Sequence, residues 1–191
     1  TACEYGMYAS DVTRSYPVSG RFSAEQRKIY EIVLAAQKAG FAAVKPGAAF
    51  HEVHDATVGV VVDGLLALGI LKGDRAEILR TRAYQKFYPH GSSHWVGLNV
   101  HDAGSYQYPP GVERLARYGV AQTKLEPGMV LTVEPGIYIA AGAAPDARWN
   151  DLGVRIEDVV LVTPSGMECL SCAAPREIAD VEKAIQARGQ R

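Results

Sequence analysis

Apolar residues recur three and four positions apart in several stretches of the chain, which is the spacing of an amphipathic helix. The first stretch starts with a capping box formed by Ser23 and Gln26 and runs to Gly40, a residue type that commonly ends helices. The second runs to Gly69, and another capping box at Asp74 opens a short helix. The pattern predicts helices at 23–40, at about 50–68, from 74 to before 88, and at 177–187.

Runs rich in β-branched residues predict the strands. The longest is 129–139, which is interrupted by Glu134 and then by a Pro-Gly pair. Residues 103–123 have no clear period, and we expect an irregular excursion there with one helical turn at 112–118. The other strands are expected as two short ones within 1–12 that turn at Gly6, at 95–100, at 153–162 and, after a turn at 163–166, at 167–170.

The composition is that of an ordinary folded domain. The chain has 191 residues, of which 48% are hydrophobic, so it can bury a sizeable core within one domain. Its formal net charge of −1 lacks the basic excess typical of nucleic-acid-binding proteins. No apolar run approaches the roughly 20 residues of a membrane span, and no signal peptide follows Thr1. We therefore expect a cytoplasmic protein that binds neither nucleic acid nor membrane.

The three cysteines do not suggest a disulfide framework. Cys3 stands alone, and Cys169 and Cys172 form one close pair, which favours a reducing compartment. A Cys-x-x-Cys pair can bind zinc or act in redox chemistry. However, no second Cys or His pair follows at zinc-site spacing, and no helix start follows as in a thioredoxin motif. We expect these cysteines to be structural.

Three of the five histidines, at positions 90, 94 and 101, lie between Tyr88 and Asp102. Small residues among them let the backbone approach a ligand closely. Neutral imidazole is a common ligand of transition metals, so His90, His94 and His101 indicate a metal centre or acid–base chemistry. Buried histidines that bond only to the backbone are the alternative.

The other two histidines, His51 and His54, lie three positions apart near the start of the second expected helix, so they could share a ligand. No third ligand type is evident beside them. We therefore expect a solvated helix end at this place.

Charged residues stand within or beside the expected strands at Asp11, Glu134, Arg155 and Glu157. A charge in a core strand is unfavourable unless it is paired or binds a metal. Asp11 alone could pair with Arg14 on the surface. Three carboxylates together with the histidines predict a carboxylate-rich metal centre that suits manganese, cobalt or zinc. Several carboxylates can bridge two metals about 3.5–4 Å apart, an arrangement typical of hydrolytic enzymes.

Four blocks of the sequence resemble, in order, those of the Xaa-Pro peptidases, the family of aminopeptidase P and prolidase. The blocks are Tyr8–Pro17, His90–Asp102, Glu126–Tyr138 and Gly153–Asp158, and they span most of the chain. The Ser-His-Trp form of the second block is most similar to bacterial aminopeptidase P. The resemblance implies an α+β fold of the pita-bread type, in which helices pack on the outer face of a curved antiparallel sheet.

The resemblance also implies a set of metal ligands. Asp11 and Glu157 would bridge two divalent metal ions, and His94 and Glu134 would complete the coordination of one of them. The ions are usually manganese in this family, with zinc or cobalt as alternatives. A water or hydroxide between the two metals would be the nucleophile, because two cations lower the pKa of bound water.

Other roles that the resemblance implies concern the substrate. His101 would hold the substrate carbonyl or the developing oxyanion, and His90 would line the same pocket. Arg155 would orient Glu157 or the substrate. Tyr138 lies near enough in the sequence to contact the site and is assigned to substrate binding.

The sequence departs from the family pattern at its start. The family has a fifth protein ligand, an aspartate that precedes the residue corresponding to Asp11, and that position falls before Thr1. Residues 1–191 therefore resemble the C-terminal portion of the catalytic domain, without its upstream half and the separate N-terminal domain. The expected activity is hydrolysis of the Xaa-Pro bond in peptides with proline in second position. The expected partners are these peptides, the upstream segment and further copies of the chain in a homo-oligomer.

Three alternatives stay open from the sequence. An Xaa-Pro dipeptidase would prefer Xaa-Pro dipeptides over Xaa-Pro-Yaa tripeptides. A non-catalytic pita-bread binding module would take up no metal tightly. An amidinohydrolase of the creatinase type would turn over creatine and no Xaa-Pro peptide.

Overall fold

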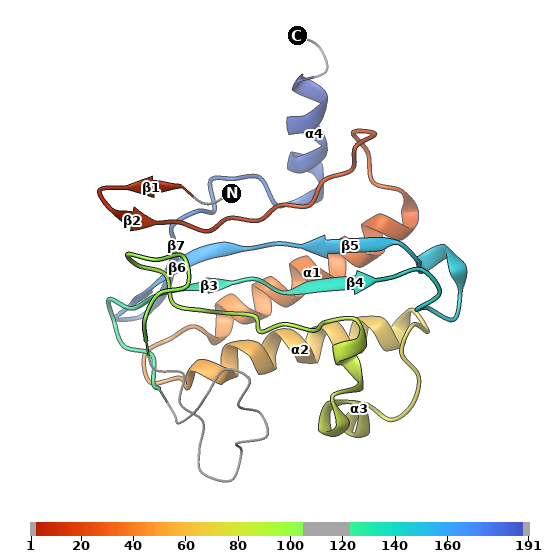
Figure 1. The fold of residues 1–191 in the computed structure, drawn as a ribbon, viewed down its shortest axis with the longest axis horizontal. Helices are drawn as coiled ribbons and strands as arrows, with labels where there is room; N and C mark the ends of the chain where they lie inside the picture. Colours follow the sequence, from red (N-terminus) through yellow and green to blue (C-terminus); the bar gives the residue numbers. More distant parts are fainter. Residues whose placement is uncertain (1–2, 105–122, 189–191) are drawn as a thin grey trace.

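The computed structural model describes residues 3–104 and 123–188. Two long helices, α1 (Ala24–Ala43) and α2 (Phe50–Ala67), lie side by side, and α1 packs against strands β3, β4 and β5 (Figure 1). The other elements are β1 (Glu4–Tyr5), β2 (Tyr8–Ala9), α3 (Arg75–Thr81), η1 (Ala83–Lys86), β3 (Val130–Val133), β4 (Gly136–Ile139), η3 (Ala147–Trp149), β5 (Leu152–Arg155), β6 (Asp158–Thr163), β7 (Gly166–Cys169) and α4 (Ile178–Arg188). The pairs β1–β2, β3–β6, β6–β7 and β4–β5 are antiparallel, which confirms the expected α+β class.

The central strands are interrupted, and the interruptions place two carboxylates side by side. β3 pairs with β6 and β4 pairs with β5, but the residues between β3 and β4 and between β5 and β6 belong to neither ladder. Pro135 accounts for the first interruption, because proline has no N–H to donate to a ladder. Glu134 and Glu157 occupy the two interruptions, so the fold brings them to the same level of the sheet.

Gly40 lies inside α1 instead of ending it, which corrects the expectation from the sequence. A β-carbon at this position would meet Cγ1 of Val133 at 2.7 Å and Cγ2 of Thr57 at 2.9 Å. Real side chains do not approach so closely, so the glycine is needed for α1, α2 and β3 to come together. Glycine is therefore required at position 40 by close packing and not by the end of a helix.

Most other expected elements are confirmed. α2 ends before Gly69, whose φ of 68° lies in the left-handed region that favours glycine. The side chain of Asp74 caps α3, and the chain turns at Gly6 between β1 and β2. The hairpin between β6 and β7 and the C-terminal helix α4 form as predicted. The helical turn expected at 112–118 lies outside the described residues.

The prediction of a strand at 95–100 is wrong. Residues 92–96 run antiparallel beside β3, and among them Trp95 forms an isolated β-bridge with that strand. The chain then turns back, with the Gly97 N–H donating to the carbonyl of Asn99 at 3.1 Å. Glycine and asparagine favour turns, and here they outweigh the apolar character of the run.

Cys169 and Cys172 are joined in a disulfide, although the sequence favoured a reducing compartment for them. Their Cα atoms are 5.6 Å apart, within the range that a disulfide spans. β7 ends at Cys169 and the chain turns at once, which brings the second sulfur back to the first. Cys3 is free and exposed.

Arg14 fastens the N-terminal segment to the C-terminal part of the chain. Its guanidinium donates to Oδ1 of Asp158 at 2.7 Å and to the carbonyls of Glu157, Ala174 and Pro175 at 2.6, 2.9 and 2.9 Å. Asp158 is fully buried, so the ion pair neutralises a charge inside the protein. These bonds hold the backbone that follows β2 against the central strands.

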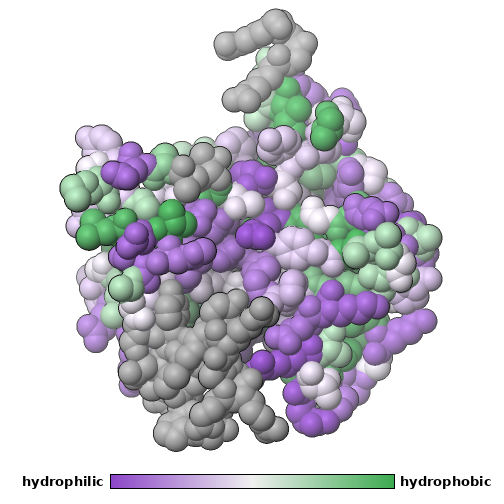
Figure 2. All heavy atoms as spheres, in the orientation of Figure 1, coloured by the Kyte–Doolittle hydropathy of each residue, from purple (hydrophilic) through white to green (hydrophobic). Residues whose placement is uncertain are grey.

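Large aromatic and apolar side chains are exposed on the β1–β2 hairpin. Tyr5, Met7 and Tyr8 of the β1–β2 hairpin are 92%, 70% and 65% exposed, and Figure 2 shows hydrophobic side chains at this edge of the molecule. Within residues 3–104 and 123–188, none of the helices combines the length and apolar character that a bilayer span requires.

Candidate metal centre

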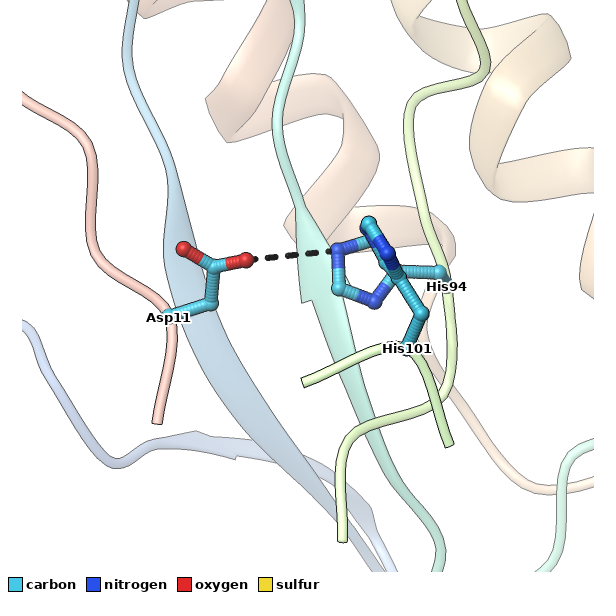
Figure 3. Close-up of side chains that lie close together, drawn as sticks. All are labelled: Asp11, His94 and His101. Carbon is cyan, nitrogen blue, oxygen red and sulfur yellow. Dashed lines mark ion pairs between the residues drawn. The ribbon is translucent and has the colours of Figure 1, made fainter. Parts of the chain in front are cut away.

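Three carboxylates surround one nitrogen of His94. Its Nε2 lies 3.5 Å from Oδ2 of Asp11, 3.5 Å from Oε1 of Glu134 and 3.7 Å from Oε1 of Glu157. Figure 3 shows Asp11 reaching towards His94, with the ring of His101 beside it. The structure therefore brings together all four residues that were expected to bind metal.

A different segment places each of these side chains. Asp11 follows β2, Glu134 and Glu157 occupy the strand interruptions, and His94 lies on the segment beside β3. Thr13 forms a β-bridge with Glu157, and its hydroxyl donates to Oε2 of Glu157 at 2.5 Å. This contact could not be predicted from the sequence, in which Thr13 stands two residues after Asp11 in the first block that resembles the Xaa-Pro peptidases.

The hydrogen bonds leave lone pairs facing the middle of the cluster. Nδ1 of His94 lies 3.1 Å from the carbonyl oxygen of Trp95, so Nδ1 carries a proton and Nε2 is the nitrogen that faces the carboxylates. Oε1 of Glu157 is buried and has no hydrogen-bond partner among the described residues. Such a set of acceptors requires a cation or shared protons to balance it. Carboxylate oxygens with one imidazole fit a divalent cation of the manganese, cobalt or zinc type.

Burial and the repulsion between neighbouring carboxylates alter the pKa values in the cluster. Burial and then the charge of Glu157 raise the pKa of Glu134 to about 7, and the same two causes raise the pKa of Asp11. Burial acts to raise the pKa of Glu157 too, but the neighbouring imidazole of His94 and the hydrogen bond from Thr13 outweigh it and lower that pKa. Burial acts to lower the pKa of His94, but Glu157 and the backbone outweigh it and raise that pKa. A divalent cation would displace the protons that the cluster holds.

A second group of polar side chains adjoins Glu134. Nη1 of Arg155 lies 3.5 Å from Oε2 of Glu134, and Nε of Arg155 donates to the hydroxyl of Tyr138 at 2.6 Å. His90 has its Nε2 2.8 Å from the Tyr138 hydroxyl and its Nδ1 2.6 Å from the carbonyl of Gly91. The carbonyl requires a proton on Nδ1, so the Tyr138 hydroxyl donates to Nε2. The hydrogen bonds therefore run in one direction from Arg155 through Tyr138 and His90 to the carbonyl of Gly91, and Arg155 separately faces Glu134.

His101 packs edge-on against His94, with ring centroids 4.3 Å apart, and it is exposed to solvent. An exposed imidazole next to buried ligands is well placed to contact a bound molecule. Ligand atoms of Asp11, His94 and His101 also lie within 4.8 Å of one another, so metal ligation by His101 is geometrically open as well.

Two of the simpler interpretations from the sequence are wrong. Arg14 pairs with Asp158 and not with Asp11. His54 does not lie at a solvated helix end: it is partly buried, burial lowers its pKa to about 4, and its Nδ1 lies 2.7 Å from Oγ of Ser92. Nothing in the sequence signals this contact, because Ser92 is distant from α2 along the chain.

Comparison with known proteins now identifies the family. Residues 1–164 match the model of metallopeptidase family M24. The chain belongs to metallopeptidase family M24. Membership of a metallopeptidase family implies divalent metal ions as cofactors, and the M24 chain offers oxygen and nitrogen ligands for them around His94.

Individual M24 relatives are similar over almost the whole chain. An Xaa-Pro aminopeptidase from Haemophilus influenzae is 47% identical over 180 residues, which cover 94% of this chain and 39% of that protein. Aminopeptidase PepP of Pseudomonas aeruginosa superposes with a TM-score of 0.89 at 45% identity, over 99% of this chain and 41% of that one. A glutamate-to-alanine variant of Escherichia coli aminopeptidase P in complex with substrate superposes with a TM-score of 0.88 at 41% identity. The match covers 99% of this chain and 40% of that one.

These similarities confirm the pita-bread architecture that the sequence resemblance implied. The chain spans about two fifths of the length of the relatives that it matches, with 39% of the Haemophilus influenzae protein covered.

Proposed function

We propose that the chain forms the metal-binding part of an Xaa-Pro aminopeptidase, which hydrolyses the bond before proline and releases the N-terminal residue of a peptide. The observation that carries the proposal is the convergence of three carboxylates on Nε2 of His94, with His101 beside it. The cluster occurs in an M24 chain that is 47% identical to a protein named Xaa-Pro aminopeptidase. A peptide with proline in second position is therefore the proposed substrate.

The ligands proposed for two divalent ions are Asp11, His94, Glu134 and Glu157. Manganese is the proposed metal, with zinc and cobalt as alternatives, because carboxylate oxygens outnumber the imidazole. When bound, the ions supply Lewis acidity that activates water and polarises the scissile carbonyl. Thr13 engages one oxygen of Glu157 and Arg155 faces one oxygen of Glu134, so the second oxygen of each carboxylate is free for a metal.

His101 and His90 are the residues proposed to contact the substrate. His101 is exposed beside the cluster, where it can donate a hydrogen bond to a carbonyl oxygen whose negative charge grows during attack. His90 and Tyr138 would line the pocket for the proline side of the bond. Arg155 donates to Tyr138 and thereby directs the tyrosine hydrogen towards His90.

The metal centre is proposed to belong to a longer catalytic domain. Because the chain covers 39% of the Haemophilus influenzae relative, residues 1–191 would be the C-terminal portion, and an upstream segment would supply a further ligand. The exposed β1–β2 hairpin suits contact with that segment or with a second copy in a homo-oligomer. A cytoplasmic location is part of the same proposal, and in that compartment the Cys169–Cys172 disulfide would be reduced to two thiols.

The test is peptide hydrolysis by the full-length protein with Mn²⁺. We expect release of the first residue from an Xaa-Pro-Yaa peptide and loss of this activity in His94→Ala and Glu134→Ala. Glu126→Ala, in an exposed turn, is the matched control that keeps the activity. Undiminished hydrolysis in both ligand variants would refute the proposed site.

The same assay separates the alternative functions. Cleavage of Xaa-Pro dipeptides in preference to tripeptides would assign the enzyme to the dipeptidases. Turnover of creatine without cleavage of Xaa-Pro peptides would assign it to the amidinohydrolases. Absence of tight Mn²⁺ uptake in a calorimetric titration would indicate a non-catalytic binding module.

A further inference from the structure

Four polar side chains meet in the interior beneath the loop at 90–94. Oγ of Ser92 lies 2.7 Å from Nδ1 of His54 and 2.5 Å from Oγ1 of Thr57, and it also contacts the hydroxyl of Tyr88. Thr57, Tyr88 and Ser92 are 0% exposed, and polar groups this deep are unfavourable unless each is hydrogen-bonded. We call these four residues the Ser92 cluster. Two of them come from α2 and two from the chain that leads into the metal centre.

The hydrogens of the Ser92 cluster have one arrangement that fills every short contact. Thr57 donates to the carbonyl of His54 at 2.8 Å, so its oxygen accepts from Ser92. Ser92 has a single hydrogen, so it accepts from the Tyr88 hydroxyl and from Nδ1–H of His54. Because no donor is spare, loss of one hydroxyl leaves another buried group without its partner.

The backbone of Ser92 is bonded to the metal centre. Its carbonyl accepts from the N–H of Glu134 at 2.7 Å, and two residues later the carbonyl of His94 accepts from the N–H of Thr132 at 2.9 Å. The chain bends at Ser92, so its side chain enters the cluster while its carbonyl stays on Glu134. One residue thus connects α2 to both segments that carry His94 and Glu134, whose side chains approach to 3.5 Å.

Directed hydrogen bonds attach this loop to α2. A cavity of about 410 Å³ lies between α2, α3 and the loop, and it is lined in part by His54, His90 and Ser92. Beside this cavity, the hydrogen bonds of the Ser92 cluster join the loop to α2. Tyr88 also packs edge-on against His90, with ring centroids 5.1 Å apart, and His90 contacts Tyr138.

We propose that the Ser92 cluster sets the spacing of the metal ligands, and that His54 and Thr57 of α2 are positioning residues of the site. The proposal rests on the metal centre proposed above, but not on the peptide that the enzyme cleaves. Ser92 fixes the position of the loop relative to Glu134, and His94 lies on that loop. Loosening the cluster lets the loop move towards the cavity, which separates His94 from Glu134 and lowers metal affinity.

The test uses a matched pair of variants at one position in the full-length protein. Thr57→Val removes the hydroxyl and keeps the shape, whereas Thr57→Ser keeps the hydroxyl. Val61→Ala, one helical turn further along α2 and equally buried, is the control for general loss of stability. In calorimetric titrations with Mn²⁺ we expect Thr57→Val to bind about 10–100-fold more weakly. We expect Thr57→Ser and Val61→Ala to keep the wild-type affinity, although Val61→Ala lowers Tm.

Hydrogen exchange at the Glu134 amide in the metal-free protein gives a second readout that needs neither metal nor substrate. We expect faster exchange in Thr57→Val and Ser92→Ala than in Val61→Ala. Equal Mn²⁺ affinity and equal Glu134 exchange in Thr57→Val and Val61→Ala would overturn the proposal. A wild type that binds no Mn²⁺ would overturn both proposals, whereas one that binds Mn²⁺ but cleaves no Xaa-Pro peptide would refute the function alone.

Discussion

Replacement of Glu134 by glutamine is expected to stabilise the metal-free protein at neutral and alkaline pH. In the folded state, burial and the charge of Glu157 raise the pKa of Glu134 from its ordinary 4.5 to about 7. As the pH rises, the unfolded chain therefore releases this proton first, and stability falls between about pH 4.5 and 7. The difference between the two pKa values corresponds to a loss of about 3 kcal/mol in the free energy of unfolding. Glutamine has no proton to release, so the Glu134→Gln variant does not undergo this loss. His94 acts in the same direction, because a raised folded pKa contributes stability at low pH that is lost as the pH rises.

Urea unfolding in the presence of a chelator measures this effect. At pH 8 we expect Glu134→Gln to be more stable than the wild type by about 3 kcal/mol, or by about 6–12 °C in Tm. At pH 4.5 and below we expect no comparable difference, because the wild-type carboxyl is largely protonated when folded. Glu126→Gln, in an exposed turn, is the control without a pH-dependent gain. A Glu134→Gln variant no more stable than the wild type at pH 8 would show that repulsion among the ligands does not destabilise the fold.

Three further changes have expected outcomes. Tyr138→Phe removes a hydroxyl that accepts from Arg155, so kcat/KM on an Xaa-Pro-Yaa peptide should fall roughly 10–100-fold while Mn²⁺ affinity in a titration stays unchanged. Gly40→Ala places a methyl group against Val133 and should lower the unfolding free energy in urea by about 1–3 kcal/mol; an unchanged midpoint would mean that α1 can shift freely. Reduction of the Cys169–Cys172 disulfide, which closes a very short loop, should lower stability by about 2 kcal/mol or less and leave Mn²⁺ affinity intact, as calorimetry with and without a reductant can check.

The residues of the candidate metal centre stood out in the sequence because each one has a charged or polar side chain that its local surroundings do not favour. Asp11, Glu134 and Glu157 are charges in or beside β-forming runs, and His94 stands among small residues in a histidine-rich stretch. A charge in such a place needs a partner, so the sequence itself signals that the partners meet. The sequence could not show how they meet, since the interruption of the strands at Glu134 and Glu157 is a property of the paired sheet.

The wrong predictions share a physical cause, which is that packing between distant segments overrides local signals. Glycine often ends helices, but Gly40 lies within α1, where Val133 of β3 leaves no room for a β-carbon. His54 has the position of a solvated helix start, but Ser92 covers it. Residues 95–100 have strand composition, but the turn at Gly97 reverses them. Local propensities amount to only a fraction of a kcal/mol per residue, so such contacts readily outweigh them.

The contacts of Arg14 make the metal centre a late product of folding. Its partners Asp158 and Ala174 lie 144 and 160 positions further along the chain. Helices α1 and α2 are neighbours in sequence and can form early, whereas contacts over such separations close last. During synthesis on the ribosome, the full set of bonds made by Arg14 therefore cannot form until the residues around 174 have emerged. We therefore expect a divalent metal to bind after these segments have come together, and not to a nascent chain that exposes a partial set of the proposed ligands.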